Sequence, residues 1–187
     1  MIPGLREEMD EYLRRHPDDA GRLSLLLEQM DDDPRIGDRS NMRGHVVSSV
    51  MTLDRTRRRA LLILHRAYGL WIPPGGHYEG TGTLYVSAKR ERREETGLRH
   101  SAPVGGSPML LDVDTHPIAP RADKDEGAHF HHDLMYLETI DVDFRPSLQV
   151  EEVAGGEWHD LDAIAAHGGR MARLVERIRM LPPSLLA

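Results

Sequence analysis

The stretch that decides the fold is Gly75–Leu98, which reads GGHYEGTGTLYVSAKRERREETGL. It begins with a glycine turn, and the residues that follow Thr83 predict a helix of about 14 residues, roughly 21 Å long. Glu91, Glu94 and Glu95 lie near the end of this helix with the spacing i, i+3, i+4. This spacing places three like charges on one helix face, which weakens an isolated helix. A divalent cation held by oxygen ligands would offset the repulsion, so the stretch predicts a magnesium site that binds phosphates.

The same stretch resembles the Nudix box, G-x5-E-x7-R-E-U-x-E-E-x-G-U, in which U is a bulky aliphatic residue. The matching positions are Gly76, Arg90, Glu91, Glu94, Glu95, Gly97 and Leu98. Gly82 stands where the family has its first glutamate, and Arg92 stands where an aliphatic residue is usual. We expect the stem of Arg92 to cover apolar surface while its charge reaches water. The alternative, a solvated charged helix after a turn, does not explain the glycines at both ends.

The resemblance implies an α/β fold, a Nudix-type α/β/α sandwich with a mixed β-sheet. It implies a Nudix hydrolase domain over residues 39–187, preceded by an N-terminal helical extension over residues 1–38. The implied activity is Mg²⁺-dependent cleavage of a diphosphate bond in a nucleotide or a nucleoside diphosphate-linked metabolite, with Mn²⁺ as a substitute. Gly82 motivates the alternative, a catalytically weakened module that binds such a molecule without turnover. An isoprenoid-diphosphate isomerase is disfavoured because that chemistry uses cysteine, and the chain has none.

The resemblance also implies roles for individual residues. The metal ligands would be Glu91, Glu94 and Glu95, joined by the Gly75 carbonyl, while Gly76, Arg90 and Gly97 would support the box. Arg90 precedes Glu94 by four residues and can orient it through a salt bridge. In this family a glutamate from the loop before the closing strand often reaches the metal site, which makes Glu151 and Glu152 candidates. The general base is then Glu91 or one of these two, although acids in such a loop can equally be solvent-exposed.

Two predicted strands after the box carry alternating polar residues, which places them on one face of each strand. The first, Leu110–Ile118, carries Asp112, Asp114 and His116; the second, His129–Leu137, carries His129, His131 and Asp133. These two strands, and the approach GLWIPPGGH to the box, resemble a bacterial group of Nudix proteins with an N-terminal helical extension. We predict that the substrate is bound by His45, His77, His129, His131 and Asp133. The alternatives are a second metal centre of zinc, manganese or iron, and histidines that are merely hydrogen-bonded in a polar sheet face.

Composition is that of a globular protein, with 39% hydrophobic and 29% charged residues in 187. The net charge of −7 disfavours a general nucleic-acid-binding surface, but it is compatible with a small phosphorylated substrate held through metal. The longest apolar run, Ala60–Leu64, is too short to cross a membrane. We therefore expect a cytoplasmic enzyme. The predicted helices over residues 5–30 form a packing or dimerisation element, so a homodimer is included among the expected assemblies.

Overall fold

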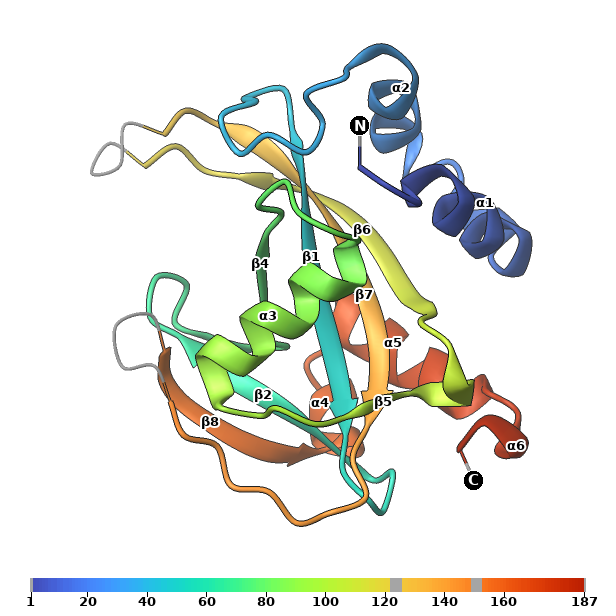
Figure 1. The fold of residues 1–187 in the computed structure, drawn as a ribbon, viewed down its shortest axis with the longest axis vertical. Coiled ribbons are helices and arrows are strands. Elements are labelled where there is room, and N and C mark those ends of the chain that lie inside the picture. Colours follow the sequence, from blue (N-terminus) through green and yellow to red (C-terminus); the bar gives the residue numbers. More distant parts are fainter. Residues whose placement is uncertain (1, 122–125, 149–152, 187) are drawn as a thin grey trace. The chain divides into compact units, whose positions relative to one another are not determined.

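The computed structural model describes residues 2–121, 126–148 and 153–186, and it confirms the α/β class with a mixed β-sheet and an N-terminal helical segment (Figure 1). The strands are β1 (His45–Leu53), β2 (Arg59–His65), β3 (Leu70–Ile72), β4 (Gly75–His77), β5 (Ala102–Pro103), β6 (Leu110–Ile118), β7 (His129–Thr139) and β8 (Val153–Asp160). The helices are α1 (Leu5–Arg15), η1 (Pro17–Asp19), α2 (Ser24–Asp32), α3 (Leu84–Thr96), η2 (Val104–Gly106), α4 (Leu161–Ala165), α5 (Gly169–Met180) and α6 (Pro183–Leu186).

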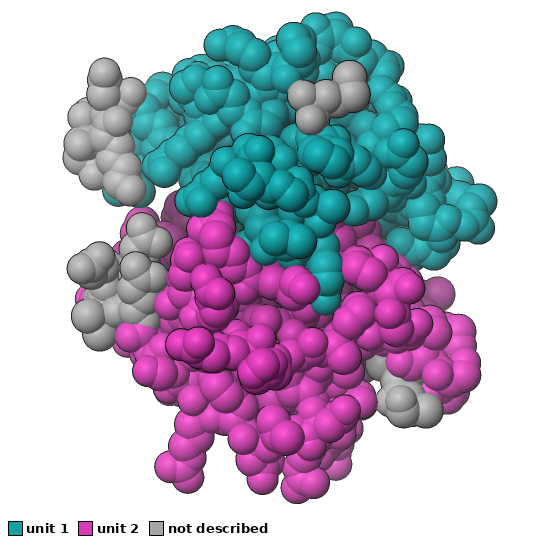
Figure 2. All heavy atoms as spheres, in the orientation of Figure 1, with its two compact units in different colours: residues 1–48, 76–87, 113–134 teal, residues 49–75, 88–112, 135–187 magenta. Residues whose placement is uncertain are grey.

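The chain divides into two compact units (Figure 2). Unit 1 comprises residues 1–48, 76–87 and 113–134, and unit 2 comprises residues 49–75, 88–112 and 135–187. Helix α3 and strands β1, β4, β6 and β7 contribute residues to both units. The box is therefore shared: its loop and the first turn of its helix belong to unit 1, and its carboxylates belong to unit 2.

Unit 2 is built on strands in the order β3-β2-β1-β7-β5, with β8 also paired to β2. Strand β2 is antiparallel to β1, β3 and β8, with Leu61 opposite Trp158 of β8 and Ile63 opposite Ile72 of β3. Side chains alternate along β2, so Leu61 and Leu62 serve different cores. Leu62 packs in the cluster that includes the apolar side of α5, and Leu61 packs in a second cluster with Leu98.

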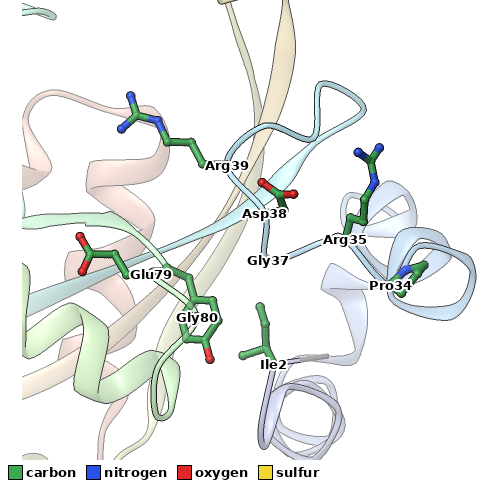
Figure 3. A pocket seen from close by; sticks show the side chains of 9 residues that line it. Ile2, Pro34, Arg35, Gly37, Asp38, Arg39, Glu79 and Gly80 are labelled. Atoms are coloured by element: carbon green, nitrogen blue, oxygen red, sulfur yellow. The ribbon is translucent and has the colours of Figure 1, made fainter.

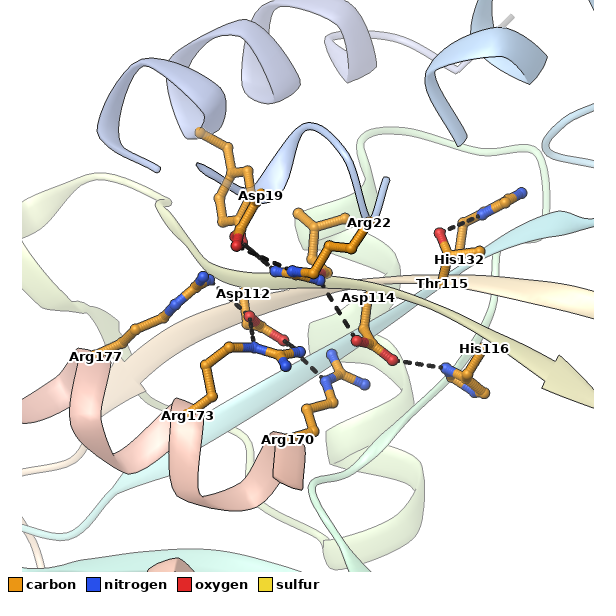
Figure 4. A network of polar contacts seen from close by, with 12 residues as sticks. Asp19, Arg22, Asp112, Asp114, Thr115, His116, His132, Arg170, Arg173 and Arg177 are labelled. Carbon is orange, nitrogen blue, oxygen red and sulfur yellow. Dashed lines mark hydrogen bonds and ion pairs between the residues drawn. The ribbon is translucent and has the colours of Figure 1, made fainter. Parts of the chain in front are cut away.

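Unit 1 holds the N-terminal helices, the start of β1, the end of β4, β6 from Val113 onward and β7 as far as Leu134. Helix α1 buries Leu5, Met9 and Tyr12 completely or nearly so. The Arg22 guanidinium donates to the Val113 carbonyl of β6 and lies 3.5 Å from the Asp114 carboxylate (Figure 4). These contacts tie the helices to strand residues by polar as well as apolar packing. The predicted boundary between residues 1–38 and 39–187 stays a prediction.

The termini of helix α3 follow the local signals in the box. The Thr83 hydroxyl oxygen accepts a hydrogen bond from the Val86 N–H at 3.4 Å, as expected of an N-cap. Gly97 has a φ of 74° and donates its N–H to the Arg93 carbonyl, which closes the helix in the left-handed conformation that glycine adopts at low cost. Among the described residues, no helix has both the length and the apolar character needed to cross a bilayer.

Candidate functional site

The three box glutamates lie in the unit 2 part of helix α3 and differ in exposure. Glu95 is only 2% exposed, whereas the side chains of Glu91 and Glu94 are 16% and 41% exposed. Arg90 contacts both of the latter: its guanidinium nitrogens lie 2.8 Å from Glu91 Oε1 and 2.9 Å from Glu94 Oε2. The predicted ion pair between Arg90 and Glu94 is confirmed, and the same guanidinium also orients Glu91. Arg90 thereby offsets the repulsion between neighbouring carboxylates.

Glu95 connects the helix to the glycine turn. The Gly75 N–H donates to Glu95 Oε2 at 3.0 Å, and the preceding Pro74 carbonyl accepts from the Val50 N–H at 3.0 Å. The turn is thus fixed both to the buried end of the carboxylate face and to strand β1. Three carboxylates and the Gly75 carbonyl offer a metal only oxygen donors, and this donor type suits a hard cation such as Mg²⁺. Among the described residues, the three glutamates do not form a group whose ligand atoms all lie within 4.8 Å of one another. The chemistry of these donors therefore fits the predicted metal.

The glutamates predicted as alternative bases, Glu151 and Glu152, lie outside the described residues. Glu157 follows them on β8, opposite Leu62 in the strand register, and its side chain is exposed. The identity of the general base stays a prediction.

Gly82, the first departure from the box, has a φ of 69°. This left-handed conformation is strained for a residue with a side chain, and a Cβ placed there would lie 3.6 Å from the Val86 side chain. The Gly82 carbonyl accepts a hydrogen bond from the Tyr78 hydroxyl at 3.0 Å, which holds the loop in this shape. The missing carboxylate thus coincides with a backbone conformation that favours glycine.

Arg92, the second departure, corrects our expectation. Its side chain is 2% exposed, so the guanidinium does not reach water but forms an ion pair with Glu138, itself 0% exposed. Ser101 completes the group by donating its hydroxyl to Glu138 Oε2 at 2.8 Å. The expectation was wrong because a buried carboxylate 46 positions away in the sequence supplies the counter-charge, and no local pattern reveals such a partner.

Four of the five residues predicted to bind substrate form a histidine cluster in unit 1, consisting of His45, His77, His129 and His131. His45 is central: its ring centroid lies 4.8 Å from that of His129, 4.9 Å from that of His131 and 5.1 Å from that of His77. Within the described residues, His45, His77 and His131 form a group in which one ligand nitrogen from each lies within 4.8 Å of the others. Asp133 is buried on the same strand as His131 but does not belong to this group.

The ring nitrogens of the histidine cluster have defined roles. His45 Nδ1 lies 3.2 Å from the Asn41 carbonyl and His129 Nδ1 lies 2.8 Å from the Gly127 carbonyl. A carbonyl only accepts, so both Nδ1 atoms carry a hydrogen, and the neutral ring of His45 presents a lone pair at Nε2. His129 Nε2 lies 3.8 Å from Glu126 Oε1. The Nε2 atoms of His45, His129 and His131 are buried and have no hydrogen-bond partner in the part of the chain that is described. Burial, reinforced by the neighbouring histidines, lowers the pKa of His131 to about 2, and burial lowers that of His45 as well.

His132 faces away from the histidine cluster, as strand alternation requires. Its Nε2 lies 3.0 Å from the Gln29 carboxamide oxygen and its Nδ1 lies 2.9 Å from the Thr115 hydroxyl. Burial, followed by the neighbouring His45, His116 and Arg43, lowers its pKa to about 4. Both of its ring nitrogens are engaged, so His132 is a structural histidine that links α2 to β6 and β7.

The predicted polar row on β6 does not act as one set. Asp114 contacts Arg22 and His116 within unit 1. Asp112, which belongs to unit 2, is fully buried and binds three arginines of α5 (Figure 4). The arginines are Arg170 at 2.9 Å, Arg173 at 3.0 Å and Arg177 at 2.6 Å. Sequence reasoning missed this group, although arginines spaced i, i+3, i+7 on one helix face signal a shared acidic partner.

A cavity of about 570 Å³ opens in unit 1 between the loop after α2 and the loop after β4 (Figure 3). Its charged lining includes Arg35, Asp38, Arg39 and Glu79, with Tyr78 beside them. This volume is within the range of small-molecule sites. None of the predicted site residues lines it, although Tyr78 directly follows His77.

Comparison with known proteins places the chain in a family. The sequence profile of the NUDIX domain matches residues 42–178, well over half of the chain. No curated protein shows significant sequence similarity to it.

Several solved structures share its fold. The E. coli dihydroneopterin triphosphate pyrophosphohydrolase matches with a TM-score of 0.56 and 16% identity, covering 74% of this chain and 95% of that chain. The C. elegans Ap4A hydrolase matches with a TM-score of 0.53 and 18% identity, covering 72% of this chain and 94% of that chain. The NUDIX domain of Shewanella oneidensis NrtR, complexed with ADP ribose, matches with a TM-score of 0.53 and 16% identity, covering 82% of this chain and 96% of that chain. At these identities the likeness shows the fold alone, and the profile match carries the assignment. The chain belongs to the Nudix hydrolase family.

Proposed function

We propose that the protein is a divalent-metal-dependent pyrophosphohydrolase that cleaves a diphosphate bond in a nucleotide or a nucleoside diphosphate-linked metabolite. The observation that carries this proposal is the carboxylate face of α3. There, Arg90 braces Glu91 and Glu94, and Glu95 is anchored to the glycine turn through Gly75. An all-oxygen donor set suits chemistry that depends on positioning and charge neutralisation.

The proposed ligands of Mg²⁺, or of Mn²⁺ in its place, are Glu91, Glu94, Glu95 and the Gly75 carbonyl. When bound, the cation neutralises phosphate oxygens and lowers the pKa of water. Arg90 orients two of these carboxylates, and the hydrogen bond from Gly75 holds the third, which limits the freedom of all three side chains. A glutamate then accepts the proton from the attacking water, and the candidates remain Glu91, Glu151 and Glu152.

The shared chemistry of the structural relatives supports a proposed substrate class. Two of these relatives are named for dihydroneopterin triphosphate and Ap4A, and a third is complexed with ADP ribose. Each of these molecules combines a heterocycle with a phosphoanhydride. We propose a substrate of the same general kind for this chain. Direct substrate contact by His45, His77, His129, His131 and Asp133, a cytoplasmic location and a homodimer stay predictions.

A substrate screen tests the proposal. Phosphate and pyrophosphate release is measured across nucleotide sugars, ADP-ribose-like compounds, dinucleotides and nucleoside triphosphates, with Mg²⁺, with Mn²⁺ and with chelator. We expect metal-dependent turnover that falls at least about 100-fold in Glu95→Gln, because loss of even an outer-shell partner typically costs 10- to 100-fold. Glu176→Gln, which changes an exposed acid on α5, is the matched control and should keep full activity.

One outcome would favour the alternative that Gly82 raises. Tight binding of a screened compound without turnover in any metal, together with turnover in Gly82→Glu, would mean that the natural chain is a binding module. Turnover that survives both chelator and Glu95→Gln would contradict the proposed site itself.

A further inference from the structure

We propose that the histidine cluster of unit 1 is a binding site for a transition-metal ion of the Zn²⁺ type, with His45, His77 and His131 as ligands. The three residues come from β1, β4 and β7, so the strands of this unit bring together donors that are remote in sequence. This site uses none of the carboxylates proposed to hold Mg²⁺. It therefore stands independently of the proposed hydrolytic activity.

The spacing of the donors suits a small cation. One ligand nitrogen from each of the three rings lies within 4.8 Å of the other two. Zinc binds imidazole nitrogen at about 2.1 Å, which places tetrahedral donors about 3.4 Å apart. The widest separation would thus close by roughly 1.4 Å on binding, a movement that side-chain rotation can supply.

The hydrogen bonding of His45 prepares it as a ligand. Its side chain is completely buried, its Nδ1 hydrogen is committed to the Asn41 carbonyl, and its Nε2 has no hydrogen-bond partner within the described chain. Metal-ligating histidines almost always have this arrangement, in which a carbonyl fixes the tautomer and orients the ring. A buried acceptor without a partner costs free energy that coordination would recover.

His131 and His129 extend the argument. His131 is 7% exposed, its Nε2 also has no hydrogen-bond partner among the described residues, and its ring lies 4.9 Å from that of His45. His129 stacks on His45 with an interplanar angle of 22° and restrains that ring. The Nε2 atoms of His45 and His131 thus both lie buried without a hydrogen-bond partner in the described chain. Three protein ligands leave a fourth position open for water or a ligand oxygen.

The chemistry favours a borderline transition metal over both Mg²⁺ and a phosphate. Imidazole nitrogens suit zinc, copper, iron and nickel, whereas Mg²⁺ prefers oxygen. The ring hydrogen of His45 is committed through Nδ1 to the Asn41 carbonyl, so its Nε2 offers a lone pair to a metal and no donor to a phosphate oxygen.

The test measures metal retention rather than activity. The full chain is stripped with chelator, loaded with Zn²⁺ and desalted, and its metal content is determined by mass spectrometry. We expect about one Zn²⁺ per chain in the natural protein, and at least 100-fold weaker binding in His45→Gln and in His131→Gln. His100→Gln, at an exposed histidine, is the matched control and should bind normally. Circular dichroism checks that each variant is folded.

Two further measurements keep the outcomes distinct. The triple change Glu91→Gln, Glu94→Gln, Glu95→Gln should abolish Mg²⁺-dependent hydrolysis but retain Zn²⁺, and loss of Zn²⁺ there would reassign the ion to the carboxylates. Pulsed electron paramagnetic resonance on the Cu²⁺-loaded natural chain should detect imidazole nitrogens, and it does not depend on the folding of any variant. The absence of those signals, or unchanged Zn²⁺ retention in His131→Gln, would overturn the proposal.

Discussion

Arg92 and Glu138 form an ion pair in which both side chains are removed from water, one 2% and the other 0% exposed. Arg92 occupies the box position where an aliphatic residue is usual, so the chain has replaced an apolar contact with a charged one. The Ser101 hydroxyl also donates a hydrogen bond to the Glu138 carboxylate. A buried ion pair adds little net stability, because desolvation of both charges offsets their attraction, but removal of one partner leaves the other charge buried and unpaired.

We therefore expect Arg92→Leu and Glu138→Gln each to lower the free energy of unfolding. For Arg92→Leu the loss should be about 3–5 kcal/mol, because the buried Glu138 carboxylate is left without its partner. The double variant Arg92→Leu, Glu138→Leu should recover much of that loss, because it removes both charges. Urea unfolding followed by circular dichroism measures the difference.

Arg55→Met is the control for that experiment, since Arg55 pairs with Asp143 in the open, where the two side chains are 59% and 88% exposed. An exposed pair contributes at most about 1 kcal/mol. If Arg92→Leu and Arg55→Met lowered the free energy of unfolding by the same amount, the buried pair would not hold the helix in place.

The carboxylate of Asp112 balances three guanidinium groups from α5 and is itself 0% exposed. We expect Asp112→Asn to destabilise the protein by about 3 kcal/mol or more, because the arginines then repel one another without a central anion. Arg173→Met should cost less, since Arg170 and Arg177 keep their contacts. Asp162→Asn, on a 90% exposed side chain paired with Arg179, is the matched control in thermal unfolding. Equal losses in Asp112→Asn and Asp162→Asn would contradict this account.

Asp54 makes the turn between β1 and β2 sensitive to acid. Burial by itself would raise its pKa, but hydrogen bonds from the Thr56 hydroxyl and from Arg59 and Arg58 outweigh burial and hold the pKa below the ordinary 3.8. A carboxylate with a lowered pKa stabilises the folded state fully above its unfolded pKa, and this stabilisation disappears as the pH falls through the folded value.

The difference in unfolding free energy between the natural chain and Asp54→Asn should therefore be constant above about pH 5 and shrink below pH 4. Urea titrations from pH 3 to pH 7 measure it. A difference that grows toward low pH would have the wrong sign and would contradict the hydrogen-bonding argument. The same contacts include an ion pair between Arg59 and Asp54 at 2.9 Å.

Local patterns predicted the elements well, and they did so for a physical reason. The strand Leu110–Ile118 was bounded correctly, and the strand predicted over His129–Leu137 extends only to Thr139, since strand signals act within a few residues. Side-chain partners were harder to predict. The grouping of His45, His77 and His131 depends on how three strands are registered, and a shift of one residue would turn each ring to the other face. Neither that register nor the carboxylate that meets Arg92 is written in the neighbouring sequence.

Gly82 is the position where the family motif and the local backbone disagree most directly. Its φ of 69° is strained for residues with a Cβ, so we expect both Gly82→Ala and Gly82→Glu to destabilise the protein by about 1 kcal/mol. Gly82→Asn should cost less, because asparagine tolerates the left-handed region. Gly21→Ala is the control, since a Cβ at Gly21 meets nothing within 4 Å.

We also expect Gly82→Glu to leave kcat/KM on the best substrate of the screen within a few-fold of the natural value. The proposed ligands Glu91, Glu94, Glu95 and Gly75 do not include this position, and the Tyr78 hydroxyl already fixes its carbonyl. Steady-state kinetics at saturating Mg²⁺ measure the effect, with Gly82→Ala separating strain from charge. A gain of tenfold or more in Gly82→Glu but not in Gly82→Ala would show that the carboxylate itself was limiting. The natural site would then lack a ligand or base that its chemistry can use.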